Sequence, residues 1–441
     1  MKFLNLFFFF IILIGCSFDN KSGIWKNENI TEKRDQKAFK EFKNLLSANQ
    51  SFNEIIKLKN NTGFRISKKI KNLEWKDKFY NNSNYYDNFS YNDLNKLIFN
   101  SKKISRHKLN ETLLFYNNNA IVSDKKGNMI IFSIETNQVI DKFNFYKKEF
   151  KNIEKKLNFI INDTTIFITD NIGFVYAYNF KERKILWAKN FKIPFRSNIK
   201  IFKNKIITSN QNNDLYFIDI KNGDLLRLIP TEETSVKNNF INNLSLSRSN
   251  TYFLNTFGSL YAFDNESMKI RWFLNLKSSV DLNSRDIFSS TQIINNGNHL
   301  IVSSNQFLYI LNPDNGRIIF KKNIVSKINP VVNKNYIFLV SETNLLIALD
   351  INQKKVVYSY DINEKIAKFL NTKKKNVYYK DIMLVNDKIF IFLKNSYYLI
   401  FNVYGEIENV RKLPTKIYSV PIFINNSILY LNNKNKISVI D

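Results

Sequence analysis

The chain from Phe64 to its end alternates short apolar strands with polar turns. One phrase recurs: a turn residue, an apolar strand ending in Asp or Asn, a second turn and a second strand. Its clearest copies are Gly173–Asn179, followed by Lys184–Trp187, and Gly258–Asp264, followed by Lys269–Trp272. Apolar positions that repeat with a period of two predict β-strands rather than helices.

Weaker copies of the phrase extend the series to eight. Another apolar run precedes each copy, as at Thr165–Thr169 and Lys388–Phe392, and a further short strand lies upstream, as at Asn158–Ile161. The copies end roughly 40 to 50 residues apart, which is the spacing of propeller blades. We therefore predict an all-β fold, an eight-bladed β-propeller of four-stranded blades. The weaker copies are Gly127–Ser133, Asp214–Asp219, Gln306–Asn312, Asn344–Asp350, Tyr397–Asn402 and Lys436–Asp441.

The last copy ends at Asp441 after its third strand, so one strand is missing from blade eight. An open sheet edge is prone to pair with other chains. The segment Ile70–Phe79 resembles the fourth-strand phrase Lys184–Phe191, with Trp75 in the place of Trp187. We predict that this N-terminal strand closes the ring; the alternative is that Trp75 is an aromatic residue in a loop. Two β-sandwiches or a solenoid are the alternative folds, but neither predicts an even series that lacks one strand.

The first residues have the pattern of an export signal. Met1 and Lys2 precede an apolar run from Phe3 to Ile14, which is followed by Gly15 and Cys16. This run is too short for a spanning helix, which needs about 20 apolar residues. We predict that residues 1–15 are a lipoprotein signal peptide and that Cys16 is lipidated, which would anchor the protein in a membrane. The alternative is an ordinary cleaved signal with an incidental cysteine.

Residues 16–63 are rich in Lys and Asn and are predicted to be a lipidated linker ahead of a propeller domain at 64–441. No Asp directly follows Cys16; in proteobacterial lipoproteins an Asp there resembles a signal for retention in the inner membrane. An outer-membrane location on the periplasmic face is therefore favoured for a Gram-negative source. One short amphipathic helix is expected within Thr31–Asn49, because apolar residues recur there at helical spacing: Phe39, Phe42, Leu45 and Leu46.

The chain has a formal net charge of +28. Such a charge is typical of proteins that bind nucleic acid or an anionic surface. An exported protein rarely meets nucleic acid, so we expect no nucleic-acid partner. A solvated basic surface is the main interpretation, and an anionic partner or lipid headgroup is the alternative. Cys16 is the only cysteine, so neither a disulfide nor a thiolate metal site can form within the chain.

The repeated phrase resembles the blade motif of the pyrroloquinoline-quinone (PQQ)-type propeller superfamily. Its marks are the Gly, the strand containing Tyr or Leu, the terminal Asp and the Ile or Leu before Trp. The residues Leu13, Ile14, Gly15 and Cys16 form a lipobox, the cleavage motif of lipoproteins. With this motif and the eight repeats, the chain is similar to the BamB-type lipoproteins over Met1–Cys16 and Phe64–Asp441. The resemblance implies a scaffold subunit of the outer-membrane β-barrel assembly machinery that binds periplasmic domains of the central barrel subunit. It also implies that the protein is a monomer within that complex. It implies neither catalysis nor a cofactor.

Phe195 and Arg196 are the candidate partner-binding residues. They match a family contact patch, a Leu followed by Arg after the fourth strand of an early blade, with Phe in place of Leu. Exposed aromatic residues and arginines often anchor interfaces. The alternative is that Phe195 belongs to the core and Arg196 to a solvated turn. The acidic residues that the family uses at the start of the next blade are absent from Phe240–Asn243.

A quinoprotein-like enzyme is the main alternative from another functional class. Such enzymes resemble this fold but rely on a vicinal cysteine pair, a divalent cation and an acidic base, and the cysteine pair cannot exist here. His107 and His299 lie in different repeats, and we expect both at the surface or in turns. Asn312–Gly316 lacks the bidentate Glu of a calcium loop and is predicted to be a β-turn. A propeller that binds a polysaccharide or peptidoglycan is the third interpretation.

Overall fold

A computed structural model describes residues 16–19, 24–27, 51–59, 63–146, 150–233, 241–277 and 288–441. The chain divides into two compact units, Met1–Gln50 and Ser51–Asp441. In the first unit, β1 (Cys16–Asp19) pairs antiparallel with β2 (Ile24–Asn27). Residues 1–15 and the helix expected within Thr31–Asn49 lie outside the described residues, and lipidation of Cys16 stays a prediction.

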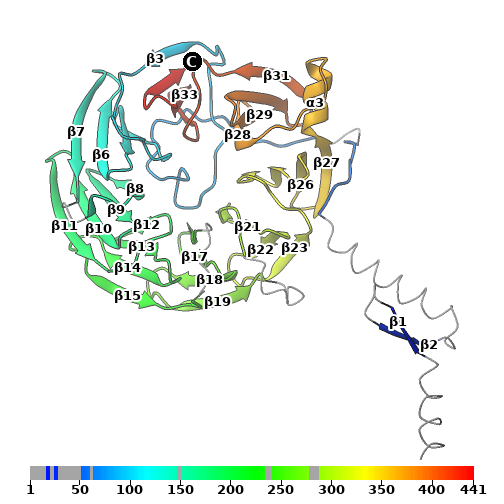
Figure 1. Cartoon of the computed structure of the whole chain (residues 1–441), viewed down its shortest axis with the longest axis horizontal. Helices are drawn as coiled ribbons and strands as arrows, with labels where there is room; N and C mark the ends of the chain where they lie inside the picture. Colours follow the sequence, from blue (N-terminus) through cyan, green and yellow to red (C-terminus); the bar gives the residue numbers. More distant parts are fainter. Residues whose placement is uncertain are drawn as a thin grey trace, which may run out of the picture. The chain divides into compact units, whose positions relative to one another are not determined.

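The second unit is a ring of eight four-stranded antiparallel sheets (Figure 1). The recurring phrase of the sequence is the third strand of each sheet, so the predicted eight-bladed propeller is confirmed. Blades 1 to 4 comprise β4 (Leu114–Tyr116), β5 (Asn119–Ser123), β6 (Asn128–Ser133) and β7 (Gln138–Asn144); β8 (Leu157–Asn162), β9 (Thr165–Asp170), β10 (Phe174–Asn179) and β11 (Lys184–Asn190); β12 (Lys200–Phe202), β13 (Lys205–Ser209), β14 (Leu215–Asp219) and β15 (Leu225–Ile229); and β16 (Asn243–Leu246), β17 (Asn250–Leu254), β18 (Ser259–Asp264) and β19 (Ile270–Asn275).

The remaining blades follow the same order, with the fourth strand of each on the outside of the ring (Figure 1). None of the helices in the described ranges has the length and apolar character that a bilayer-spanning segment needs. Blades 5 to 8 comprise β20 (Ile294–Asn295), β21 (Leu300–Ser303), β22 (Leu308–Leu311) and β23 (Ile318–Lys322); β24 (Val331–Asn333), β25 (Tyr336–Val340), β26 (Leu345–Asp350) and β27 (Lys355–Asp361); β28 (Tyr379–Val385), β29 (Lys388–Leu393), β30 (Tyr397–Asn402) and β31 (Ile407–Lys412); and β32 (Ile422–Ile424), β33 (Ser427–Leu431), β34 (Ile437–Ile440) and β3 (Leu97–Asn100).

The fourth strand of blade eight is β3, which pairs antiparallel with β34. The prediction that Ile70–Phe79 supplies this strand is therefore wrong. The physical reason is burial. The outer strand β3 alternates half-buried and exposed residues, as the outer strand β7 does toward its end. Trp75 is only 1% exposed, which suits a position inside the ring.

Tryptophan side chains of blades 2 and 4 pack against the blades that follow them. The indole of Trp187 in β11 lies against Gly223 in the turn between β14 and β15, and its Nε1 donates to the Ile220 carbonyl at 3.1 Å. A Cβ atom at Gly223 would lie 2.5 Å from the indole, and the glycine has a φ of +76°. Trp272 packs against Gly316 in the same way. These contacts explain why Gly and Trp recur in the repeat.

The outer edge of blade 6 is covered by the start of the second unit. Ile56 exchanges backbone hydrogen bonds with Ser359 of β27, at 3.2 and 2.9 Å. The helix α3 (Ile362–Phe369), capped by the Asp361 side chain, follows β27 directly. Residues 51–59, which the sequence placed in the linker, therefore pack on the propeller, because they satisfy an otherwise open strand edge.

Candidate functional site

Residues Phe64–Asp93, which we call the plug, run through the centre of the ring (Figure 1). The plug makes hydrogen bonds to the innermost strand of every blade. The plug therefore connects all eight blades from inside the ring. The bonds, from blade 1 to blade 8, are Trp75–Phe115, Lys76–Ile161, Asp77–Lys200, Asn82–Leu246, Ser83–Asn295, Ser67–Asn333, Phe89–Leu384 and Asn72–Phe423.

Aromatic packing holds the middle of the plug in place. Trp75 and Phe89 are almost fully buried, and their ring centroids are 5.6 Å apart. Phe89 also stacks on Phe423 of β32 at 5.7 Å. The Trp75 backbone forms a two-way bridge with Phe115 of β4, at 2.7 and 2.9 Å. Trp75 is thus a core residue of the channel and not part of an outer strand.

A buried ion pair fastens the plug to blade 3. The Lys200 ammonium, with a side chain that is 0% exposed, donates to the Asp77 carboxylate at 2.7 Å. It also donates to the Asn81 carbonyl at 2.7 Å and to Asn84 Oδ1 at 2.6 Å. Burial lowers the pKa of Lys200, and the Asp77 carboxylate opposes that shift. Three acceptors around one ammonium supply the hydrogen bonds that a charge removed from water requires.

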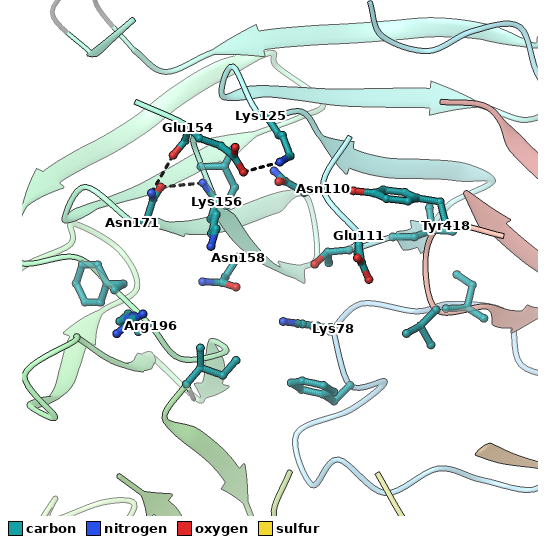
Figure 2. A pocket seen from close by; sticks show the side chains of 18 of the residues that line it. Lys78, Asn110, Glu111, Lys125, Glu154, Lys156, Asn158, Asn171, Arg196 and Tyr418 are labelled. Atoms are coloured by element: carbon teal, nitrogen blue, oxygen red, sulfur yellow. Dashed lines mark hydrogen bonds and ion pairs between the residues drawn. The ribbon is translucent and has the colours of Figure 1, made fainter. Parts of the chain in front are cut away.

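A cavity of about 790 Å³, which we call the funnel, lies beside the plug. Plug residues, among them Trp75, Lys78 and Phe79, line it on one side. Residues of several blades form the rest of its lining, from the innermost strands, from the segments before them and from turns between second and third strands (Figure 2). The lining includes five cationic and three acidic residues: Lys78, Lys108, Lys125, Lys156, Arg196, Glu111, Glu154 and Asp381. The funnel is therefore a polar cavity with an excess of positive groups.

Part of the funnel wall is a closed network of hydrogen bonds (Figure 2). Lys125 pairs with the Glu154 carboxylate at 2.7 Å. Asn171 donates to the Glu154 carbonyl at 2.9 Å and accepts from the Lys156 backbone N–H at 2.8 Å. By contrast, the Lys78 ammonium points into the cavity. Burial lowers the pKa of Lys78, against the opposing attraction of Glu111 and Asp77.

Asp381 is a second perturbed group in the funnel lining. Its side chain is buried and accepts a hydrogen bond from the Ile382 backbone at 2.9 Å. Burial raises the pKa of Asp381 to about 7, although this hydrogen bond and Lys380 act in the opposite direction. Near neutral pH the funnel therefore contains a carboxyl group that is only partly ionised.

Asp381→Asn is expected to change how stability depends on pH. Because the pKa of Asp381 is raised on folding, the native state retains a proton that the unfolded chain loses, and stability falls as pH rises from about 4 to about 7. Asn carries no charge, so the variant should be more stable than the wild type at pH 8, by on the order of a few kcal/mol, and similar at pH 4. Urea denaturation at both pH values measures the difference.

The exposed turn residue Asp163 offers a matched control, because Asp163→Asn should leave the pH dependence unchanged. If Asp381→Asn and the wild type lose stability equally between pH 4 and pH 8, the assignment of the raised pKa to Asp381 is contradicted.

The structure separates the two candidate partner-binding residues. Phe195 is only 2% exposed and packs edge-to-face on Phe191 and Tyr216. The expectation of an exposed aromatic anchor is wrong, because the Phe195 backbone bonds to Asp170 and draws the ring into the core between blades 2 and 3. Arg196 lies in the funnel lining (Figure 2). Partner binding by Arg196 stays a prediction.

The remaining sequence candidates lie where they were expected. His107 is exposed, and His299 is in the turn between β20 and β21. Asn312–Gly316 forms the turn between β22 and β23, closed by a 3.0 Å bond from Gly316 N–H to the Asn312 carbonyl. The plug and Lys78 were missed as site elements, because no local pattern distinguishes a segment that enters a channel from an ordinary strand.

Comparisons with known proteins agree with the repeat. A family model described as outer membrane protein assembly factor BamB (PQQ_2) matches residues 256–394. Over those residues the chain is similar to the PQQ-like propellers. No curated protein sequence matches it.

Solved structures share the fold of this propeller. The crystal structure of BamB from Moraxella catarrhalis has a TM-score of 0.59 at 13% identity, covering 77% of this chain and 99% of that one. Quinohemoprotein alcohol dehydrogenase from Comamonas testosteroni has a TM-score of 0.60 at 11% identity, covering 83% and 80%. The C-terminal WD40 domain of Sif2 has a TM-score of 0.55 at 12% identity, covering 78% and 97%. At these identities the likeness shows the fold alone.

The propeller fits a quinone cofactor poorly. Cys16 is the only cysteine, so no vicinal pair is available. In the ranges that the structure describes, His, Cys, Asp and Glu form no cluster of three or more that could hold a metal ion. The buried side chains of the plug and the Asp77–Lys200 pair occupy the centre of the ring. We therefore derive no reaction step through such a group.

Proposed function

We propose that the chain is a non-catalytic scaffold of the BamB type, held through lipidated Cys16 at the periplasmic face of the outer membrane. There it binds periplasmic domains of the central subunit of the β-barrel assembly machinery. The match of residues 256–394 to the BamB family model carries the proposal. That match covers blades 5 and 6 and parts of blades 4 and 7.

The plugged channel supports a scaffold over an enzyme. A catalytic site needs converging acid, base or metal groups at a place that substrate can reach. Here the plug uses its polar side chains to bond the blades, and the Asp77 carboxylate is committed to Lys200. The funnel keeps Lys78 and Asp381, which can bind a ligand but form no hydrogen-bonded pair in the described structure.

An exposed apolar edge supports a protein partner. Leu225, Leu226 and Leu228 of the outer strand β15 are all exposed. An exposed apolar strand edge readily accepts an added strand from another protein. The chain itself shows the same mode at blade 6, where Ile56 pairs with the outer strand β27. A scaffold can use an exposed apolar edge to bind other domains. An enzyme that works alone has no use for such an edge, which is prone to aggregate.

Arg196→Ala is expected to weaken binding to the isolated periplasmic domains of the barrel subunit. Arginine anchors at an interface typically contribute at least 2 kcal/mol, so the dissociation constant should rise about thirtyfold. Calorimetry with the purified domains measures this change. Arg248→Ala is the control, because Arg248 is exposed in the turn between β16 and β17 and does not line the funnel.

Two results would count against the proposal. Unchanged affinity in Arg196→Ala would remove this residue from the interface. Failure of the wild-type protein to bind the domains at all would overturn the assembly role and favour an envelope polysaccharide or peptidoglycan as the ligand.

A further inference from the structure

Lys78 has an unusual position for a lysine. Its ammonium points into the funnel (Figure 2), and burial lowers its pKa. Within the part of the chain that the structure describes, it makes no hydrogen bond or ion pair. Its Nζ lies 5.3 Å from the centroid of the Phe79 ring. A half-buried charge without a protein acceptor is costly, and an anion that entered the funnel would supply one.

Three carboxylates near Lys78 each pair with another lysine. Asp77 pairs with Lys200 at 2.7 Å. Glu154 pairs with Lys125 at 2.7 Å. Glu111 lies 3.5 Å from the Lys380 ammonium, and its side chain is 63% exposed. None of these three carboxylates bonds to Lys78, so a ligand that entered the funnel could supply its partner.

The size and the lining of the funnel indicate the kind of anion. Its volume of about 790 Å³ is in the range of ligand sites and far exceeds what a single small ion needs. Lys78 is a half-buried cation of the lining, and both Glu111 and Asp381 also line the cavity. Close to Lys78, Glu111 and Asp381 repel a singly charged carboxylate less than they repel a doubly charged phosphate, so the local charges favour a carboxylate.

The walls add amide groups that suit a peptide. Asn158 points toward the cavity (Figure 2), and Gln211 lies in the lining beside Arg196. A primary amide both donates and accepts, as the peptide group does, so these side chains can bond a main chain of any sequence. Lysine and arginine at the wall attract acidic segments over a longer range.

We propose that the funnel binds an acidic peptide segment, one carboxylate of which pairs with Lys78 while Asn158 and Gln211 bond its main chain. This proposal does not rest on the identity of the assembly partner proposed above, although Arg196 lines the same funnel, because any acidic loop can supply the chemistry that Lys78 requires.

Fluorescence anisotropy tests the site with a labelled, end-capped peptide that alternates Glu with Gly. We expect the wild type to bind this peptide and to bind the matched Gln peptide at least about tenfold more weakly. Lys78→Met keeps the length of the side chain and removes its charge, so it should lower affinity at least about tenfold. Glu111→Gln removes a competing negative charge and should raise affinity severalfold.

Lys355→Met is the control, because Lys355 is exposed on the outer strand β27; it should bind as the wild type does. Melting temperatures show that each variant is folded, and Glu111→Gln provides a second readout with the opposite sign if Lys78→Met unfolds. Equal binding of the Glu and Gln peptides, or unchanged affinity in Lys78→Met, overturns the proposal. If free glutarate binds as tightly as the peptide, the inference that the ligand is a peptide is overturned. If inorganic phosphate displaces the peptide better than glutarate, the inference that the anion is a carboxylate is overturned.

Discussion

Asp77→Ala is expected to destabilise the propeller by about 3 to 5 kcal/mol, because it leaves the ammonium of Lys200 buried without its counter-ion. Lys200 is fully buried, and only the Asn81 carbonyl and Asn84 Oδ1 would still accept from it. The plug bonds to all eight blades, so its loosening should affect the ring as a whole. Urea unfolding followed by circular dichroism measures the loss.

A double variant separates the cost of the orphaned charge from the value of the contact. Asp77→Ala combined with Lys200→Met removes both charges, and replacing a buried pair with apolar groups is often close to neutral. We therefore expect the double variant to recover most of the stability that Asp77→Ala loses. A double variant as unstable as the single one would show that Asp77 acts through another contact.

Trp187→Ala should also cost about 3 to 5 kcal/mol, since it empties a large site between blades 2 and 3. The indole packs on Gly223 and donates to the Ile220 carbonyl. Thermal unfolding of the variant measures the loss, and a downward shift in the melting temperature is the expected result.

Gly223→Ala tests the geometry of this contact through a double-mutant cycle. In the wild type the added methyl group would lie 2.5 Å from the indole, so overpacking adds about 1 to 3 kcal/mol to the strain of a positive φ. In the Trp187→Ala background the clash is gone and only the backbone strain, about 1 kcal/mol, should remain. Strictly additive effects would contradict direct packing between Trp187 and Gly223.

The sequence predicted those parts of the fold that local patterns determine. The third strand of each blade is an apolar run between turn residues, as in Gly258–Asp264, and such a run is buried along most of its length. The recurring Gly and Trp were also apparent in the sequence, because the Trp187–Gly223 contact has a counterpart, Trp272–Gly316, two blades further on. Eight copies in series reinforce one another where a single copy would be weak.

Long-range placement was not predictable in the same way. Ile70–Phe79 resembles an outer strand by composition, yet its Trp75 bonds to Phe115 in the innermost strand of blade 1. The true closing strand, Leu97–Asn100, is short and carries no tryptophan. Which of two apolar segments reaches the open edge depends on the path of the whole chain, and that path is set by tertiary contacts.

The candidate site was predictable only in part. Arg196 was identified through its match to a family contact patch; it lies in the funnel lining, and its binding of a partner stays a prediction. Phe195 is buried because Tyr216 and Phe191 offer it an aromatic pocket from neighbouring strands, which adjacent sequence does not reveal. Lys78 gave no signal, since its role follows from burial and from the absence of a nearby acceptor.

Site-specific photo-crosslinking in living cells tests the scaffold role most directly. A benzophenone amino acid in place of Arg196 should crosslink the chain to a large outer-membrane barrel protein, while the same amino acid in place of Asp163, exposed in the turn between β8 and β9, should not. Crosslinks to that barrel protein from position 163 alone, or from neither position, would contradict the account.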